Sequence, residues 1–226
     1  MTSYDRTFDL PVAFPPQSMA NIVAEVVSNA GMAMFRTAET EKYAHVTYFF
    51  NGGVEVPFPR EDRLLVPSQK VPTYDLAPEM SAAGVSDVLC RAIEAREHEF
   101  ILCNFANGDM VGHSGSLPAT ITAVETVDGC LTRLVASAEK AGARLLITAD
   151  HGNCEMMIDP QTGGPHTAHT TSPVPLVVVD PAGERPLRGG GALCDVGPTI
   201  LQLLGLERPV EMTGTDLRQL EAGVTA

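Results

Sequence analysis

The sequence predicts an α/β fold in which a mostly parallel sheet carries helices on both faces. Two observations support this prediction. Segments whose apolar residues have helical spacing alternate along the chain with short strand-like segments. The strand-like segments, such as FILCNF at 100–105 and PLVVVD at 175–180, are continuous apolar runs, which is typical of strands buried on both faces.

The first half of the chain is expected to supply one helix, two strands and a long loop. Apolar residues have helical spacing over 19–27, and Gly31 follows as a C-cap. The segments MAMFRTAET at 32–40 and HVTYFF at 45–50 have the composition of strands. Residues 51–82 are rich in proline and show little periodicity, which predicts a long loop of the kind that is usually functional.

The second half of the chain is expected to alternate helices with strands. From the spacing of apolar residues we expect helices over 85–93, 121–135 and 195–205, and strands over 100–105, 143–150 and 173–180. The carboxyl ends of parallel strands meet at one edge of a sheet, and the ligands of such sheets bind there. Side chains that directly follow these strands are therefore the first candidates for a functional site.

Length, charge and cysteine content restrict the class of protein. The 226 residues suffice for one large domain, with residues 1–16 as a hinge or linker arm and residues 17–226 as the folded part. A formal net charge of -13 disfavours binding to nucleic acid and to anionic membranes. Five cysteines without a CxxC pair, together with the lack of a signal-like start or a long apolar run, indicate a cytoplasmic protein.

Three short segments carry carboxylate or imidazole side chains after predicted strands or within glycine-rich stretches. They are NGDMVGHSG with Asp109 and His113, ITADHGNCE with Asp150 and His151, and GGPHTAHT with His166 and His169. We predict that the first segment is a loop at the mouth of a strand, so that Asp109 and Asp150 lie at the same edge of the sheet. Each piece alone is weak evidence, but three such pieces at strand exits predict a metal site.

The ligand types indicate which ions this site would take. Carboxylate and imidazole groups without thiolates suit Mn²⁺, Zn²⁺ or Mg²⁺. Two clusters of this kind would hold two ions about 3.5–4 Å apart, an arrangement that stabilises both oxygens of a phosphoryl transfer. His166 and His169 cannot be distinguished as ligands by this reasoning alone.

Seven segments, in order along the chain, match the pattern of one known family. They are YDRTFDLPVAFPP, AETEKYAHVTYFFNGG, PSQKVPTYDLAPEMSA, NFANGDMVGHSG, ITADHGNCE, PHTAHTTSPVPLV and PTILQLLGLERPVEMTG. They resemble the cofactor-independent phosphoglycerate mutases, members of the alkaline phosphatase superfamily. The resemblance covers essentially the whole chain and implies an alkaline-phosphatase-like phosphotransferase domain with two Mn²⁺ ions, or Mg²⁺ or Zn²⁺ in their place, and no need for 2,3-bisphosphoglycerate.

The resemblance also implies a role for individual residues. By position it implies two ligand sets, Asp109, His113 and His169 for one ion and Asp150 and His151 for the other. Lys42, in EKYAHVT, matches a lysine that contacts the substrate phosphoglycerate. The implied reaction is the glycolytic interconversion of 3-phosphoglycerate and 2-phosphoglycerate through a phosphoserine intermediate.

The sequence departs from the family pattern in one important respect. The family's nucleophilic serine lies in an N-terminal segment, with an aspartate ligand of the second ion, and neither this segment nor an arginine-rich substrate-binding domain is found in these 226 residues. We therefore expect the C-terminal portion of the phosphotransferase domain, whose partner is the missing N-terminal part of the same enzyme. The chain alone is expected to be inactive, because Ser114 and Ser116 are not expected to replace the serine.

Two other functions stay open at this point. A metal-dependent phosphatase or another hydrolase of the same superfamily would share the metal-binding segments, although the segment around Lys42 favours the mutase. A non-catalytic metal-binding fragment would also fit a chain that lacks the serine. Without the resemblance, Lys42 would be taken for an ordinary exposed lysine.

Overall fold

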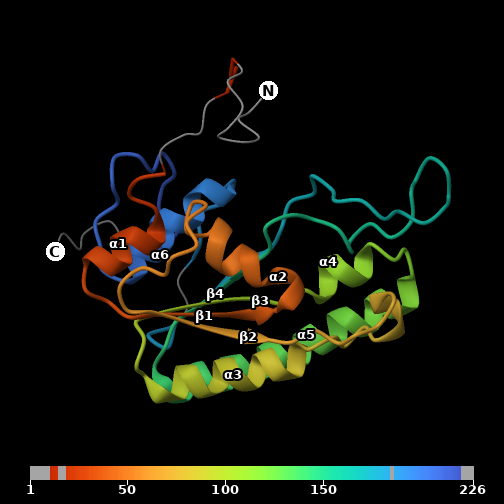
Figure 1. Ribbon diagram of the computed structural model, residues 1–226, viewed down its shortest axis with the longest axis horizontal. Coiled ribbons are helices and arrows are strands. Elements are labelled where there is room, and N and C mark those ends of the chain that lie inside the picture. Colours follow the sequence, from red (N-terminus) through yellow and green to blue (C-terminus); the bar gives the residue numbers. More distant parts are fainter. Residues whose placement is uncertain (1–10, 15–18, 184–185, 220–226) are drawn as a thin grey trace.

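A three-stranded parallel sheet is the centre of the computed structural model, which describes residues 11–14, 19–183 and 186–219 (Figure 1). The sheet consists of β1 (Met34–Glu39), β2 (Glu61–Val66) and β3 (Phe100–Asn104), in the order β2-β1-β3. Every residue of β1 is buried, as a central strand of a covered sheet requires. The predicted α/β class is therefore confirmed. Of the predicted arm over 1–16, only residues 11–14 fall among the described residues.

A second, smaller sheet lies beside the first. Its strands, β4 (Leu145–Thr148) and β5 (Leu176–Val179), are antiparallel, with Leu145 opposite Val179. Within the described ranges, β3 pairs only with β1 and β4 pairs only with β5. The outer edges of β3 and β4 are therefore unpaired in this part of the chain.

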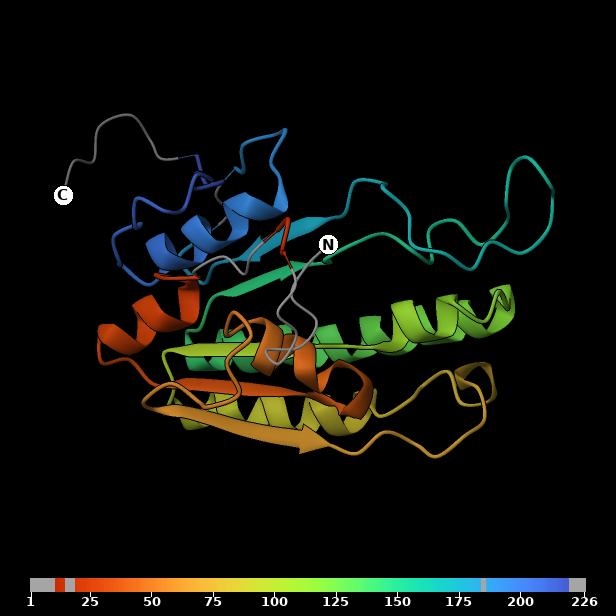
Figure 2. The same cartoon turned by 45° about the horizontal axis from the view of Figure 1, so that its top comes forward.

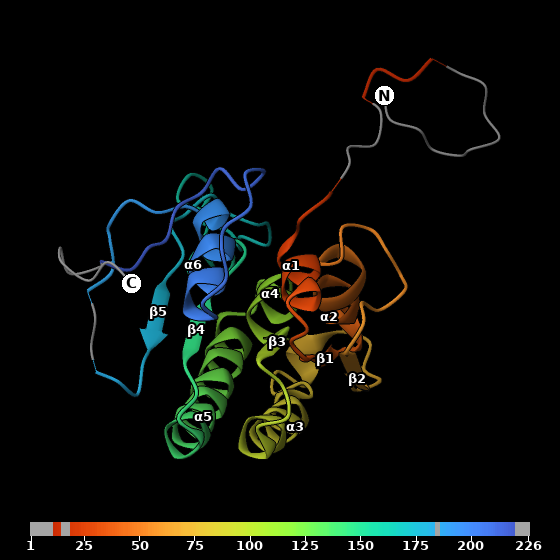
Figure 3. The same ribbon diagram turned by 90° about the vertical axis from the view of Figure 1, so that its left-hand side faces the viewer.

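Helices cover both faces of the sheets, as predicted. α3 (Ala82–Ala95) and α5 (Leu117–Ala141) lie on one face, and α1 (Val23–Asn29) and α6 (Val196–Leu203) lie on the other (Figures 1 and 3). Each face has its own apolar core. The α3 and α5 face is built on Val85, Leu89, Ile93 and Leu134, and the α1 and α6 face is built on Ala24, Val27, Met34, Phe100 and Leu201.

Two short helices stand at the ends of strands. α2 (Thr40–Ala44) follows β1 and continues into a π-helical turn (His45–Phe49), and α4 (Asn107–Gly112) follows β3. Single 3-10 turns cover Tyr74–Leu76 and Leu193–Asp195. Among the helices that can be described, none has both the length and the apolar character needed to cross a membrane.

The segment over 45–50, predicted as a strand, is helical instead. The chain passes from α2 directly into the π-helical turn, and the Thr47 hydroxyl donates a hydrogen bond to the Tyr43 carbonyl one turn earlier. β-Branched and aromatic residues favour strands mainly where a sheet is available to pack against them. Here the helix that starts at residue 40 determines the conformation, so the prediction from composition is wrong.

The predicted long loop over 51–82 contains a strand, β2, that the prediction missed. β2 is bounded by Pro59 and Pro67, and Leu64 and Leu65 are exposed along it. Prolines are compatible with the ends of an edge strand, where no neighbouring strand requires their missing N–H. The charged start and the prolines concealed a strand that lies at the edge of the sheet.

The glycine-rich segment 107–115, predicted as a loop, begins with helix α4 instead. Two glycines within the helix reduce its propensity, which is why the sequence pattern did not reveal it. Asp109 lies in the first turn, where a carboxylate interacts favourably with the helix dipole, and His113 is the C-cap. Residues four positions apart share one face of a helix, so the helix brings these two side chains together.

Candidate metal centre

Three parts of the chain meet at the carboxyl ends of β3 and β4. α4 carries Asp109 and His113, the turn after β4 carries Asp150 and His151, and a later loop carries His169. The chain between β4 and β5 extends beyond the ends of the strands and passes close to α4 (Figures 1 and 2). The side chains singled out in the sequence are thus brought to one edge of the sheets.

The tightest group consists of one carboxylate oxygen and two imidazole nitrogens. The Asp109 Oδ1 atom lies 2.8 Å from His169 Nε2 and 3.0 Å from His113 Nε2. The two Nε2 atoms lie 3.1 Å apart. Bonds of about 2.1 Å to a common ion, at right angles to each other, would separate their donor atoms by about 3.0 Å. The triangle therefore has the dimensions of three ligands around one ion.

The His113 ring makes a hydrogen bond on the side that points away from the triangle. This bond determines that Nε2, the nitrogen that faces the triangle, is an acceptor. The Nδ1 atom lies 2.7 Å from the Thr167 carbonyl oxygen, which can only accept, so Nδ1 carries the proton. In neutral His113 the Nε2 lone pair is then directed at the Asp109 carboxylate, which is also an acceptor. Two acceptors at this distance repel each other unless a proton or a metal ion lies between them. Backbone carbonyls orient metal-binding histidines in the same way.

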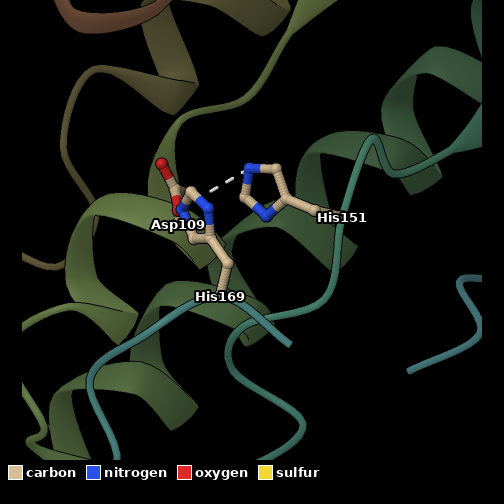
Figure 4. A group of neighbouring side chains, drawn as sticks. All are labelled: Asp109, His151 and His169. Carbon is tan, nitrogen blue, oxygen red and sulfur yellow. Dashed lines mark hydrogen bonds and ion pairs between the residues drawn. The ribbon is translucent and has the colours of Figure 1, made fainter. Parts of the chain in front are cut away.

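His151 borders this triangle. Its Nε2 atom lies 3.9 Å from Asp109 Oδ1 and 3.6 Å from Asp150 Oδ1, and its ring stacks on the His169 ring with centroids 3.8 Å apart. Figure 4 shows Asp109, His151 and His169 converging, and their candidate ligand atoms all lie within 4.8 Å of one another. Asp150 is exposed beside them. The geometry thus places a second carboxylate and imidazole next to the first group.

Asp109 is the centre of the site because its second oxygen is also engaged. Buried Lys42 places Nζ 2.5 Å from Asp109 Oδ2, and the Asn153 amide donates to Oδ1 over 3.0 Å. Burial by itself would raise the pKa of the Asp109 carboxyl. The hydrogen bonds from Lys42 and Asn153 and the charge of Lys42 outweigh burial and lower that pKa below its usual range. The carboxylate is therefore ionised and able to bind a cation.

Lys42 does not have the environment of an ordinary surface lysine. Its side chain is only 8% exposed, although α2 lies near the surface. The family resemblance implies that Lys42 contacts the substrate. The contact that the structure shows is a different one, with the candidate ligand Asp109. Periodicity could not reveal this contact, because it joins residues 67 positions apart.

Other polar residues near the site have different roles. Asn107 donates to the carbonyls of Pro78 and Glu79 and so ties α4 to the preceding loop. The Ser114 hydroxyl donates to the Val111 carbonyl at the end of α4. Burial raises the pKa of the Cys154 thiol, which makes it a poor thiolate ligand.

The structure distinguishes His166 from His169, which sequence patterns alone could not. His169 Nε2 lies in the triangle, whereas the His166 Nδ1 atom is buried and has no hydrogen-bond partner within the described part of the chain. Sequence reasoning missed Glu155, which contacts the loops of two candidate ligands. No pattern in the sequence distinguishes this glutamate from other acidic residues.

Comparison with known proteins places this geometry in context. Residues 11–208 match the family described as the metalloenzyme superfamily. The 2,3-bisphosphoglycerate-independent phosphoglycerate mutase of Rhodopseudomonas palustris is 58% identical over 219 residues, which cover 96% of this chain and 43% of the relative. The protein of that name from Synechococcus elongatus is 56% identical over 226 residues, which cover 96% of this chain and 42% of the relative.

A solved structure is similar over nearly the same region. The phosphoglycerate mutase of Leishmania mexicana, determined at low cobalt concentration, superposes with a TM-score of 0.85 at 32% identity. The match covers 92% of this chain and 41% of that protein. The chain therefore spans about two fifths of the length of the relatives that it matches.

Proposed function

The chain belongs to the metalloenzyme superfamily, and from this premise we propose that it is the metal-binding part of a 2,3-bisphosphoglycerate-independent phosphoglycerate mutase. The curated relatives with that name align with nearly all of this chain. The complete enzyme would interconvert 3-phosphoglycerate and 2-phosphoglycerate in glycolysis through a phosphoserine, without 2,3-bisphosphoglycerate. Residues 17–226 would form the C-terminal portion of its phosphotransferase domain.

The observation that carries this proposal is the triangle of Asp109 Oδ1, His113 Nε2 and His169 Nε2. Three electron-pair donors lie 2.8–3.1 Å apart, and one of them is held as an acceptor by its bond to Thr167. A cation at the centre would accept an electron pair from each of these donors. This donor set suits Mn²⁺, and also Zn²⁺ or Mg²⁺.

A second ion would bind beside the first. We assign Asp109, His113 and His169 to one ion and Asp150 and His151 to the other. The distances alone group His151 with Asp109 and His169, so the division into two sets is part of the proposal. Two bound ions would supply positive charge next to the oxygens of a transferring phosphoryl group.

Lys42 would contact the phosphoglycerate. Its ammonium group is fixed beside the metal cluster by its bond to Asp109, and its burial limits competition from water. A preorganised cation of this kind stabilises an oxyanion without reorganising during the reaction. Lys42 would therefore meet a phosphate or carboxylate oxygen at the edge of the cluster.

The remainder of the enzyme would supply the nucleophilic serine and further substrate contacts. The hydroxyl of Ser114, next to His113, is occupied by the Val111 carbonyl at 2.6 Å. Among the described residues, β3 and β4 each have one edge without a neighbouring strand, and these edges lead to the candidate ligands, since Asp109 follows β3 and His151 follows β4. Further strands would pair at these edges and bring their own residues to the site.

A coupled assay tests the proposal. The purified 226-residue chain with excess Mn²⁺ should give no phosphoglycerate mutase turnover, and the chain extended to the full length of its relatives should give clear turnover. The matched control is the extended enzyme with Asp109→Ala, which should lose turnover. An extended enzyme that is inactive as a mutase but hydrolyses phosphate esters would instead support a phosphatase.

A further inference from the structure

The loop that holds His151 and the loop that holds His169 are joined directly after these two residues. The Thr170 amide donates to the Gly152 carbonyl over 2.9 Å, and the two residues form an antiparallel bridge. The rings of His151 and His169 stack next to this bridge, with an interplanar angle of 24°. The position of one imidazole relative to the other therefore depends on this junction.

Glu155 holds this junction together, although it is not one of the candidate metal ligands. Its Oε2 atom accepts a 2.7 Å hydrogen bond from the backbone amide of Asn153, and its Oε1 atom accepts a short hydrogen bond from the Thr170 hydroxyl. The bond from Thr170 is the main reason why the pKa of Glu155 is lowered to about 2. One exposed carboxylate thus bridges the two loops.

The two loops approach too closely for a larger residue at position 152. A Cβ atom on Gly152 would overlap the Thr170 hydroxyl and would lie 2.6 Å from Glu155 Oε1. Because Gly152 has no side chain, the Glu155 carboxylate and the Thr170 hydroxyl can meet beside it. This close approach indicates a specific junction rather than an incidental surface contact.

The same junction is also connected to α4, the helix that carries Asp109. Glu155 binds the backbone of Asn153, and the Asn153 side chain donates to the Asp109 carboxylate and, over 3.2 Å, to its backbone carbonyl. Asn153 itself is buried. A displacement of this backbone would therefore move the amide that orients Asp109.

We propose that Glu155 is a positioning residue for the metal cluster, which fixes His169 relative to His151 and Asp109 through Thr170 and Asn153. The inference rests on the proposed function, because positioning matters only if these side chains bind an ion. Glu155 is not one of the candidate ligands. Removal of such outer partners typically weakens metal binding about 10- to 100-fold.

The first test uses the metal-free chain and does not depend on metal binding. Stacked imidazoles shift each other's ring C–H proton resonances, so NMR of the histidine side chains reports the arrangement of His151 and His169. Glu155→Ala should change these shifts, because it removes both carboxylate oxygens, which accept from Asn153 and Thr170. Thr170→Val should cause the same change, and Thr170→Ser, which keeps the hydroxyl, should not.

The second test is a calorimetric titration with Mn²⁺. Glu155→Ala and Thr170→Val should each weaken binding about 10- to 100-fold, and the double variant should bind no more weakly than Glu155→Ala alone. Asp159→Ala is the matched control. Asp159 lies in the same extended segment, and its carboxylate accepts from the backbone amides of Gln161 and Thr162. Its bonds to Gly163 and Gly164, in the segment that leads to His169, involve only its backbone, which the substitution keeps. This control should bind Mn²⁺ as the wild type does.

The outcomes separate the two proposals. If the wild type binds Mn²⁺ tightly and Glu155→Ala binds equally tightly with unchanged histidine shifts, the positioning role of Glu155 is wrong. If His169→Ala binds Mn²⁺ as the wild type does, the metal site itself is wrong, while the histidine shifts still decide whether Glu155 orders the junction. A fall in melting temperature without any change in affinity or histidine shifts would show that Glu155 is merely structural.

Discussion

Replacing Asp109 by asparagine removes one negative charge from the centre of the site and nearly preserves its shape. Asp109 faces Lys42 Nζ at 2.5 Å, and the two side chains are only 14% and 8% exposed. The variant leaves the Lys42 ammonium buried without its counter-charge. Removing one partner of a buried pair costs about 3–5 kcal/mol. For a domain of this size each kcal/mol shifts the melting temperature by about 2–4 °C, so Asp109→Asn should melt about 6–20 °C lower.

The assay is thermal unfolding of the metal-free protein, followed by a Mn²⁺ titration of both forms. Asp87→Asn is a suitable control, because Asp87 also pairs with a cation, Arg133, but both side chains are half exposed. This control should melt close to the wild type. Asp109→Asn should also lose tight Mn²⁺ binding, since one of the three closest donors becomes an amide. A variant that is as stable as the wild type and binds Mn²⁺ equally well would refute the central role of Asp109.

Three further predictions follow from the same contacts. The pKa of Asp109 is lowered in the folded state, so its stabilising contribution is present above the unfolded pKa of about 3.9 and is lost as the pH falls through the folded value. Acid unfolding followed by circular dichroism should therefore show a loss of stability below about pH 4 that is smaller in Asp109→Asn. Lys42→Ala in the extended enzyme should cut turnover severely even at Mn²⁺ concentrations that restore full metal content, and near-normal turnover would exclude a substrate contact. Gly112→Ala should weaken Mn²⁺ binding, because its Cβ would overlap the Asn153 amide, and unchanged affinity would show that this loop yields without consequence.

The strands and helices with strong apolar patterns could be predicted from the sequence. The central strands, the helices on both faces and the placement of polar residues at strand ends all follow from apolar runs and their spacing. The edge strand β2 and helix α4 could not be predicted. Charged residues at the start of β2 and glycines within α4 interrupt the apolar patterns that mark strands and helices. The antiparallel pairing of β5 with β4 depends on contacts between distant segments, which local patterns do not contain.

The candidate site was predictable in its residue types but not in its connections. The position of Asp109 and His113 after an apolar strand was visible, although the helix that unites them was not. Lys42 and Asp109 are far apart in the sequence, so their contact leaves no local pattern. The junction through Glu155 involves residues that no sequence motif marks. Such contacts depend on tertiary structure alone.

Anomalous diffraction from crystals of the chain grown with Mn²⁺ tests the central claim most directly. We predict a manganese peak in contact with Asp109 Oδ1, His113 Nε2 and His169 Nε2, at about 2.1–2.2 Å from each. A weaker second peak should lie near Asp150 and His151, because part of that ligand set would come from the remainder of the enzyme. Absence of any peak at the triangle in crystals that contain Mn²⁺, with the three side chains as close together as here, would contradict the proposed metal site.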